Sequence, residues 1–213
     1  AKVIDLTHLD EKNRLFINEA FGDGEVSVLY HGSVKTDVQE SVLAGLWRVH
    51  YRSNSGDLLR DTIEIGEIPD MVRHAVFAQA KTEISFDESS LPAGLMNATS
   101  LIAELNDQVA KWQPGKQEHV INLSLLPHTP EDLQFLGSLL GSGPVVILSR
   151  GYGNCRITST AMKNVWWVQY FNSQDTIILN TIEVSDVPSV ACASAEDIAD
   201  SAQRMGEILG LYQ

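Results

Sequence analysis

The chain lacks the features that mark exported, disulfide-stabilised or membrane-spanning proteins. Its 213 residues include two cysteines, Cys155 and Cys192, which form no Cys-x-x-Cys motif. A protein without a disulfide framework is typical of a reducing compartment. No apolar run approaches the ~20 residues that a membrane-spanning helix needs, and no segment resembles a signal peptide. The sequence therefore predicts a cytoplasmic protein without a membrane partner.

Basic residues are scarce. Fifteen lysines and arginines stand against 28 aspartates and glutamates, which gives a net charge of −13 and a pI near 4.7. Such a surface repels phosphate backbones and anionic lipid headgroups, so nucleic acid is excluded as an expected partner. It would attract a basic partner by electrostatic steering. The alternative is that the acidity serves only solubility.

Motifs for catalysis, cofactors and metals are absent as well. Both Gly-x-Gly pairs, at Gly22 and Gly141, lie after a predicted helix and before a strand, the reverse of a phosphate-binding loop. The six histidines form no HxH, HxxxH or HExxH motif, and no GxSxG or catalytic cysteine motif occurs. We therefore predict no catalytic residue, no cofactor and no metal site. A site assembled from residues distant in sequence is the alternative.

The most informative feature that is present is an internal repeat. The stretch "FGDGEVSV" (residues 21–28) nearly recurs as "LGSGPVVI" (residues 140–147). With a shift of 119 positions, Trp47 aligns with Trp166, and "TIEIGEIP" aligns without a gap with "TIEVSDVP". Chance does not maintain a register this long, so the chain is a tandem duplication of one structural unit.

Each copy has the same predicted order of elements. Alternating segments such as "KVIDL" and "HVINL" predict strands, whereas "DEKNRLFINEAFG" and "TPEDLQFLGSLLG" predict helices with acidic first turns and a closing glycine. Four further strands and a final helix follow in each copy. The predicted fold class is α+β: two homologous tandem lobes, each a largely antiparallel sheet with helices on one side.

The repeat also sets the predicted boundaries. Residues 1–85 form the first repeat lobe, residues 86–117 a linker and connecting helix, and residues 118–213 the second repeat lobe. The connecting helix carries an apolar stripe from Ala98 to Trp112, and the last helix carries a similar stripe from Ile198 to Tyr212. We expect each stripe to pack on the sheet of its own unit. The alternative is that the stripes line a groove between the lobes.

The aromatic residues provide candidates for a contact surface. Trp47 and Trp166 occupy equivalent positions, which predicts that both belong to the core. Strand alternation then places Arg48 and Trp167 on the opposite face. Trp167 is thus a candidate exposed aromatic of the kind enriched at interface hot spots, although it would be buried if a helix covered it.

Three further residues complete the predicted contact surface. Tyr152 lies in the turn "RGYG", Met96 lies in "GLMN" between the lobes and offers an adaptable apolar contact, and Glu25 is a predicted charge at the rim. For Met96 the alternative is a plain turn that leads into the connecting helix.

The quoted phrases carry a family resemblance. "GDGEVSV", "GLWRV", "GLMN", "VINLSLLP", "GYG", "VWWVQY" and "EDIADSAQR" resemble, in this order, segments of the HupH/HyaF/HoxQ family of hydrogenase expression proteins. The resemblance extends over nearly the whole chain, and the family's C-terminal conserved region is similarly duplicated. Family members usually carry an additional N-terminal segment that this sequence does not include.

The resemblance implies a cytoplasmic accessory protein for the maturation of uptake-type nickel–iron hydrogenases. The expected partners are the precursor of the iron–sulfur small subunit, bound before its export, and other hydrogenase accessory proteins. The acidic balance fits a basic leader or a basic subunit surface. The expected function is therefore that of a non-enzymatic chaperone. The alternatives are a protein that handles a metal or an iron–sulfur cluster during cluster insertion, and a module that self-assembles through its lobes.

Overall fold

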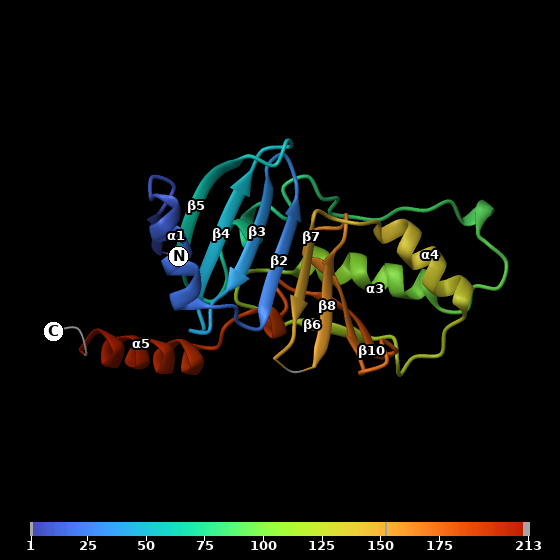
Figure 1. The fold of residues 1–213 in the computed structure, drawn as a ribbon. Coiled ribbons are helices and arrows are strands. Elements are labelled where there is room, and N and C mark those ends of the chain that lie inside the picture. The colour runs from blue at the N-terminus through green and yellow to red at the C-terminus, as the bar shows by residue number, and fades with distance from the viewer. Residues whose placement is uncertain (1, 152, 211–213) are drawn as a thin grey trace.

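The computed structural model describes residues 2–151 and 153–210, and these residues share one antiparallel sheet of ten strands. The strands follow the order β1-β5-β4-β3-β2-β7-β8-β9-β10-β6 (Figure 1). The strands are β1 (Lys2–Asp5), β2 (Val26–His31), β3 (Lys35–Glu40), β4 (Leu46–Arg52), β5 (Leu58–Ile65), β6 (His119–Asn122), β7 (Val145–Ser149), β8 (Asn154–Ser159), β9 (Val165–Phe171) and β10 (Ile177–Val184).

Helices lie between and after these strands. They are α1 (Glu11–Phe21), α2 (Asp70–His74), α3 (Ala98–Lys111), α4 (Pro130–Leu140) and α5 (Ala195–Gly210), with single 3-10 turns η1 (Glu88–Ser90) and η2 (Ser189–Ala191). The predicted α+β class, the antiparallel pairing and the tandem duplication are confirmed. We use "first lobe" for β1–β5 with α1, and "second lobe" for β6–β10 with α4.

The two lobes are joined edge to edge. Strand β2 of the first lobe pairs with β7 of the second, and in this pairing Val28 lies opposite Ile147. These two residues are equivalent in the repeat, since they are 119 positions apart. The approximate twofold axis that relates the lobes therefore passes between Val28 and Ile147. The duplication has produced one continuous sheet.

The recurring Gly-x-Gly phrase has a geometric reason. Gly22 and Gly141 end α1 and α4 with φ near 55° and 60°, a region that favours glycine. The second glycine of each pair approaches the neighbouring strand so closely that a Cβ would lie 2.2 Å from the Ser41 carbonyl oxygen at Gly24, and 2.4 Å from Ser159 Oγ at Gly143. The glycines thus act as helix caps and turns, as the order of elements predicts.

One face of the sheet carries a core that crosses both lobes. Trp47 and Trp166 are fully buried there, which confirms their predicted core role. Each indole N–H donates to a backbone carbonyl, of Gly66 and Asp186 respectively. The short α2 and η2 segments cover this face, and Phe77 packs edge-on against Trp166. Because one apolar cluster spans the junction, the lobes are also joined through their cores.

The opposite face is covered unequally. On the second lobe, α3 and α4 pack over β6, β9 and β10 around a second core that includes Leu105, Leu136 and Ile182. Helix α3 follows the first lobe in sequence but covers the second (Figure 1). Helix α5 runs outward past the first lobe, and Ser201 is its one buried residue. The expectation that each helix packs on the sheet of its own unit is therefore wrong for α3, which packs on the second lobe, and for α5, whose described stripe residues stay largely exposed. Tyr212, the predicted end of the α5 stripe, lies outside the described residues.

Candidate functional site

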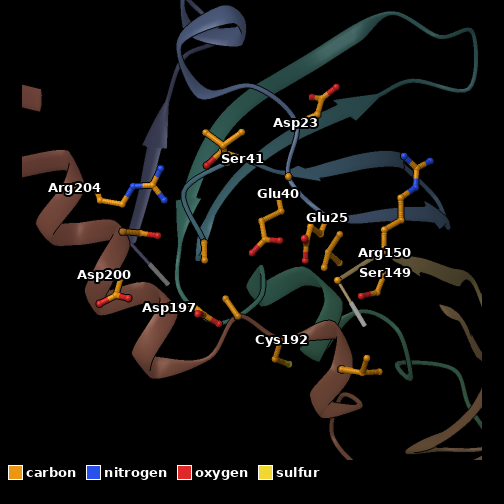
Figure 2. Close-up of a pocket in the computed structure, with 18 residues that line it drawn as sticks. Asp23, Glu25, Glu40, Ser41, Ser149, Arg150, Cys192, Asp197, Asp200 and Arg204 are labelled. Atoms are coloured by element: carbon orange, nitrogen blue, oxygen red, sulfur yellow. The ribbon is translucent and has the colours of Figure 1, made fainter. Parts of the chain in front are cut away.

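An acidic pocket of about 670 Å³ lies at the junction of the lobes. Four segments build it: the turn after α1, the end of β3, the end of β7 with the following turn, and the chain from Cys192 into α5. Figure 2 shows their side chains around one space. Its charged lining consists of Asp23, Glu25, Glu40, Asp197, Asp200, Arg150 and Arg204. Five carboxylates and two guanidinium groups thus belong to the lining.

The most buried of these carboxylates is Glu40. Its burial raises its pKa, and the nearby negative charges of Glu25 and Asp197 act in the same direction, whereas the Gly45 N–H that donates to Glu40 Oε1 at 3.3 Å acts against them. Figure 2 shows Glu25 and Glu40 pointing into the same space. A cation that entered the pocket would relieve this repulsion, so the geometry favours positively charged ligands.

The two arginines leave the carboxylates available. Figure 2 shows the Arg150 side chain extending away from Glu25 and Glu40. Of the ion pairs found among residues 2–151 and 153–210, none joins Arg150 or Arg204 to a pocket carboxylate. The pocket is therefore an anionic surface whose charges are not neutralised from within.

The fold makes room for Glu25 at the junction of the lobes. Its carbonyl accepts a hydrogen bond from Arg150 N at 3.0 Å, which extends the β2–β7 pairing. A Cβ at position 151 would lie 2.2 Å from Glu25 Oε2, so glycine at this position leaves the space that the carboxylate occupies. Glu25, the predicted rim charge, thus lies at the pocket, as a residue shared between the lobes.

Little in the described part of the chain indicates covalent or metal chemistry. Cys192 borders the pocket, but burial raises the pKa of its thiol to about 12, so it stays protonated. Cys155 is buried in the core, and burial raises its pKa to about 11. Within the described ranges, no group of three or more histidine, cysteine or acidic side chains could hold a metal ion.

Two of the other predicted contact residues require correction. Trp167 was expected to be an exposed aromatic, but it is half-buried beneath α4, where Gly137 faces its ring, and its indole N–H donates to Asn180 Oδ1 at 2.6 Å. Arg48 was expected at the contact surface and is instead buried. Its Nε and Nη2 donate to Asp61 Oδ1 and Oδ2 at 2.7 and 2.6 Å.

The remaining candidates are not brought together with the pocket. Met96 is 59% exposed in the turn before α3, as an adaptable contact requires, but it does not line the pocket. Tyr152 lies outside the described residues. Of the predicted contact residues that the structure describes, Glu25 alone belongs to the acidic pocket.

Sequence reasoning missed most of the pocket. Glu40, Asp197 and Asp200 lie on β3 and α5, far apart in sequence, and each is an ordinary polar position in its own element. The acidic first turn of α5, together with the excess of acidic residues, was a usable signal for an acidic site. No sequence pattern, however, indicated which strand ends α5 would lie beside.

Among the described helices, none combines the length and apolar character needed to cross a bilayer.

Comparison with known proteins places the sequence among hydrogenase accessory proteins. It matches the family described as "HupH hydrogenase expression protein, C-terminal conserved region" over residues 1–83 and 95–212. It is 50% identical to the hydrogenase expression/formation protein HoxQ of Cupriavidus necator, over 97% of this chain and 72% of the relative. It is 36% identical to the hydrogenase-1 operon protein HyaF of Escherichia coli, over 96% of this chain and 71% of the relative.

A solved structure is also similar. The hydrogenase expression protein HupH from Thiobacillus denitrificans is 31% identical and aligns with a TM-score of 0.48 over 55% of this chain and 95% of its own.

Proposed function

Since this chain belongs to the HupH family of hydrogenase expression proteins, we propose that it is a non-enzymatic accessory chaperone of hydrogenase maturation that binds the immature iron–sulfur small subunit of a nickel–iron hydrogenase before export. The relatives carry the names of hydrogenase expression and formation proteins, which supports a role in hydrogenase maturation. The small subunit as the bound partner is the part that we propose.

The acidic pocket is the observation that carries the proposal. Burial raises the pKa of Glu40, the charges of Glu25 and Asp197 add to this, and no ion pair among the described residues joins a pocket carboxylate to Arg150 or Arg204. A basic peptide segment would supply counterions and relieve the repulsion. A leader with paired arginines is such a segment, because guanidinium groups bind carboxylates through two parallel hydrogen bonds. The net charge of −13 would attract such a partner from a distance.

The chemistry of the described residues is in keeping with a binding role. Both cysteine thiols have raised pKa values, so neither is an activated nucleophile. The Arg48–Asp61 pair, which lies outside the pocket, is buried, and both carboxylate oxygens of Asp61 accept hydrogen bonds from Arg48.

The test is co-elution of the chain with a hydrogenase small-subunit precursor, with and without its leader. We expect binding to the precursor and weaker binding when the leader is removed. Reversal of three pocket charges, Asp23→Lys, Glu25→Lys and Asp197→Lys, should lower the association rate at low salt by on the order of 10-fold and flatten its salt dependence.

A matched control keeps the net charge equal. Asp57→Lys, Glu83→Lys and Glu88→Lys reverse three exposed carboxylates that do not line the pocket. If this control slows association as much as the pocket variant, the net charge of the whole protein steers the partner and the pocket is not the binding site. If neither precursor form binds, the chaperone proposal fails, and cluster handling becomes the candidate to test by metal analysis of the purified protein.

A further inference from the structure

The repeat leaves one sheet face covered by two helices, α3 and α4, and its counterpart covered by one, α1. On the second lobe, α3 and α4 bury a core on the sheet face that they cover. The equivalent face of the first lobe carries α1, whose described residues include none that is buried. We call this surface the first-lobe face. It consists of Ile4, Ile17, Phe21, Leu46, Ile63 and Ile65, whose second-lobe counterparts are Ile121, Leu136, Leu140, Val165, Ile182 and Val184.

The difference in burial is large at equivalent positions. Ile4 is 43% exposed and Ile65 is 37% exposed, whereas Ile121 and Val184 are 4% and 1% exposed. The apolar residues are present on both lobes, and what differs is the covering helix. A groove of about 440 Å³ also lies between α1 and the sheet, bounded by Ile17, Phe21 and Leu46 among others.

One residue of the groove lining carries a buried donor without a partner. Arg48 lines it, and Nη1 of Arg48 is buried without a hydrogen-bond partner in the described residues, although its other nitrogens bind Asp61. An unpaired buried donor of a charged group costs free energy. The groove therefore lacks an acceptor as well as an apolar cover.

Helix α5 has the properties of the missing cover. It follows the last strand of its repeat, as α3 follows the last strand of the other, and the apolar positions of the two helices coincide. When the two helices are aligned with a shift of 100 positions, Ile102, Leu105 and Val109 of α3 fall on Ala202, Met205 and Leu209 of α5. In α3 these residues pack on the second lobe, whereas in α5 Leu209 is 56% exposed.

The chain's own α5 cannot take the α3-like position. Helix α3 ends beside Lys163 and Asn164, the turn between β8 and β9. Helix α5 instead begins at the equivalent turn of the first lobe, because Ile198 contacts Gly45, the counterpart of Asn164. To copy α3, α5 would have to start about 21 Å away, the length of 14 helical residues.

The tether before α5 is too short for that displacement. Ala193 N donates to the Glu67 carbonyl at 2.9 Å, so a single residue, Ser194, separates this anchor from α5. One residue spans at most about 3.6 Å. The half of α5 after Ser201 projects away from its own lobe (Figure 1).

From these observations we propose that the first-lobe face is an interface for a second copy of this chain, and that each copy inserts the half of α5 after Ser201 into the groove of the other. The contact is reciprocal, so it closes into a dimer with twofold symmetry. Met205 and Leu209 then cover Ile17 and Phe21.

Two measurements test the proposal. Light scattering of the full chain should give twice the 23.4 kDa of a single copy. Met205→Glu with Leu209→Glu should return that mass to one copy and keep a cooperative thermal unfolding transition, at a lower midpoint because the dimer contacts are lost. Glu196→Gln with Glu207→Gln, which alters exposed charges of the same helix outside the stripe, should leave the mass doubled. A mass of one copy at all concentrations would overturn the proposal.

Cross-linking between differently tagged chains identifies the occupant. One chain carries Ile17→Cys and the other carries Met205→Cys, and a short bismaleimide should join them. The first control replaces Met205→Cys by Gln203→Cys. Position 203 lies about 200° around the helix from position 205, so this pair should not react. The second control is a pair of chains without introduced cysteines, which accounts for reaction of the native thiols. A third sample is a single chain that carries both Ile17→Cys and Met205→Cys. A cross-link within this chain, together with no cross-link between the two singly substituted chains, would mean that α5 closes on its own lobe. A cross-link to a hydrogenase precursor instead of a second copy would equally overturn the proposal.

Discussion

Single residues show how the two copies of the repeat have diverged around a conserved contact. Arg48 and Asp61 in the first lobe are equivalent to Trp167 and Asn180 in the second. Both pairs make a side-chain hydrogen bond across the same two strands, Arg48 Nη2 to Asp61 Oδ2 at 2.6 Å and Trp167 Nε1 to Asn180 Oδ1 at 2.6 Å. The position therefore requires a donor and an acceptor, and either a charged or a neutral pair meets that requirement.

This equivalence gives a prediction for the buried ion pair. Arg48→Ala should lower the free energy of unfolding by roughly 3–5 kcal/mol, because it leaves the buried Asp61 carboxylate without its partner. The double variant Arg48→Trp with Asp61→Asn, which copies the second lobe, should lose much less. Chemical denaturation measures both. A double variant as unstable as Arg48→Ala would show that the two sites are not interchangeable.

A second prediction concerns Glu40 in the acidic pocket. Its pKa is raised in the folded protein, mainly by burial, so the folded state holds the Glu40 proton more tightly than the unfolded state does. Stability from this group is therefore present at low pH and is lost as the pH rises from the ordinary glutamate range through the raised pKa. Glu40→Gln should flatten this part of the stability–pH curve. An unchanged curve would show that Glu40 is not desolvated as described.

At the scale of elements, one carboxylate joins two helices of the second lobe. Asp132 lies in the first turn of α4, accepts hydrogen bonds from Thr129 N in a capping box, and also accepts from the backbone N–H groups of Met96, Asn97 and Ala98 at the start of α3. Burial alone would raise its pKa, but these hydrogen bonds outweigh burial and lower it to about 2. The first lobe has Asn13 at this position and no second helix above it.

Asp132→Ala should therefore destabilise the protein by roughly 2–4 kcal/mol, since it removes a helix cap and leaves buried N–H groups unpaired. The contribution of the carboxylate is present above the ordinary aspartate pKa and is lost as the pH falls towards about 2. Thermal unfolding as a function of pH checks this. Asn13→Ala at the equivalent exposed site is the control, and an equal loss there would contradict the helix-joining role.

At the scale of the whole molecule, the shared sheet predicts a single unfolding unit. Ile147→Ala removes a fully buried side chain at the junction and should lower the free energy of unfolding by roughly 2–5 kcal/mol. Hydrogen exchange should show the loss in β4 and in β9 alike, because one core cluster includes both lobes. Ile178→Ala, which truncates an exposed side chain in β10, should have little effect. Loss of protection in β9 alone would mean that the lobes unfold separately.

Local pattern predicted the elements of this molecule but not its contacts. Strand alternation and helix caps depend on neighbours in sequence, so the repeat, the paired glycines and the buried Trp47 and Trp166 could be predicted. The burial of Arg48 depends on Asp61 of the adjacent strand, and that of Trp167 depends on Gly137 of α4. The acidic pocket could not be predicted from the sequence, because it depends on where α5 lies relative to the ends of β3 and β7. The alternation that set Arg48 and Trp167 on one face was correct, but it did not reveal what covers that face.

The opposition of Val28 and Ile147 across the junction has an evolutionary consequence. Because each repeat pairs there with the position equivalent to its own, a single ancestral copy could have made the same strand contact with an identical neighbour. Fusion of two such genes fixes the number of copies at two. After the fusion, a substitution in one half no longer changes the other half as well. The second half could then carry Trp167 and Asn180 at the positions where the first half carries the charged pair Arg48 and Asp61.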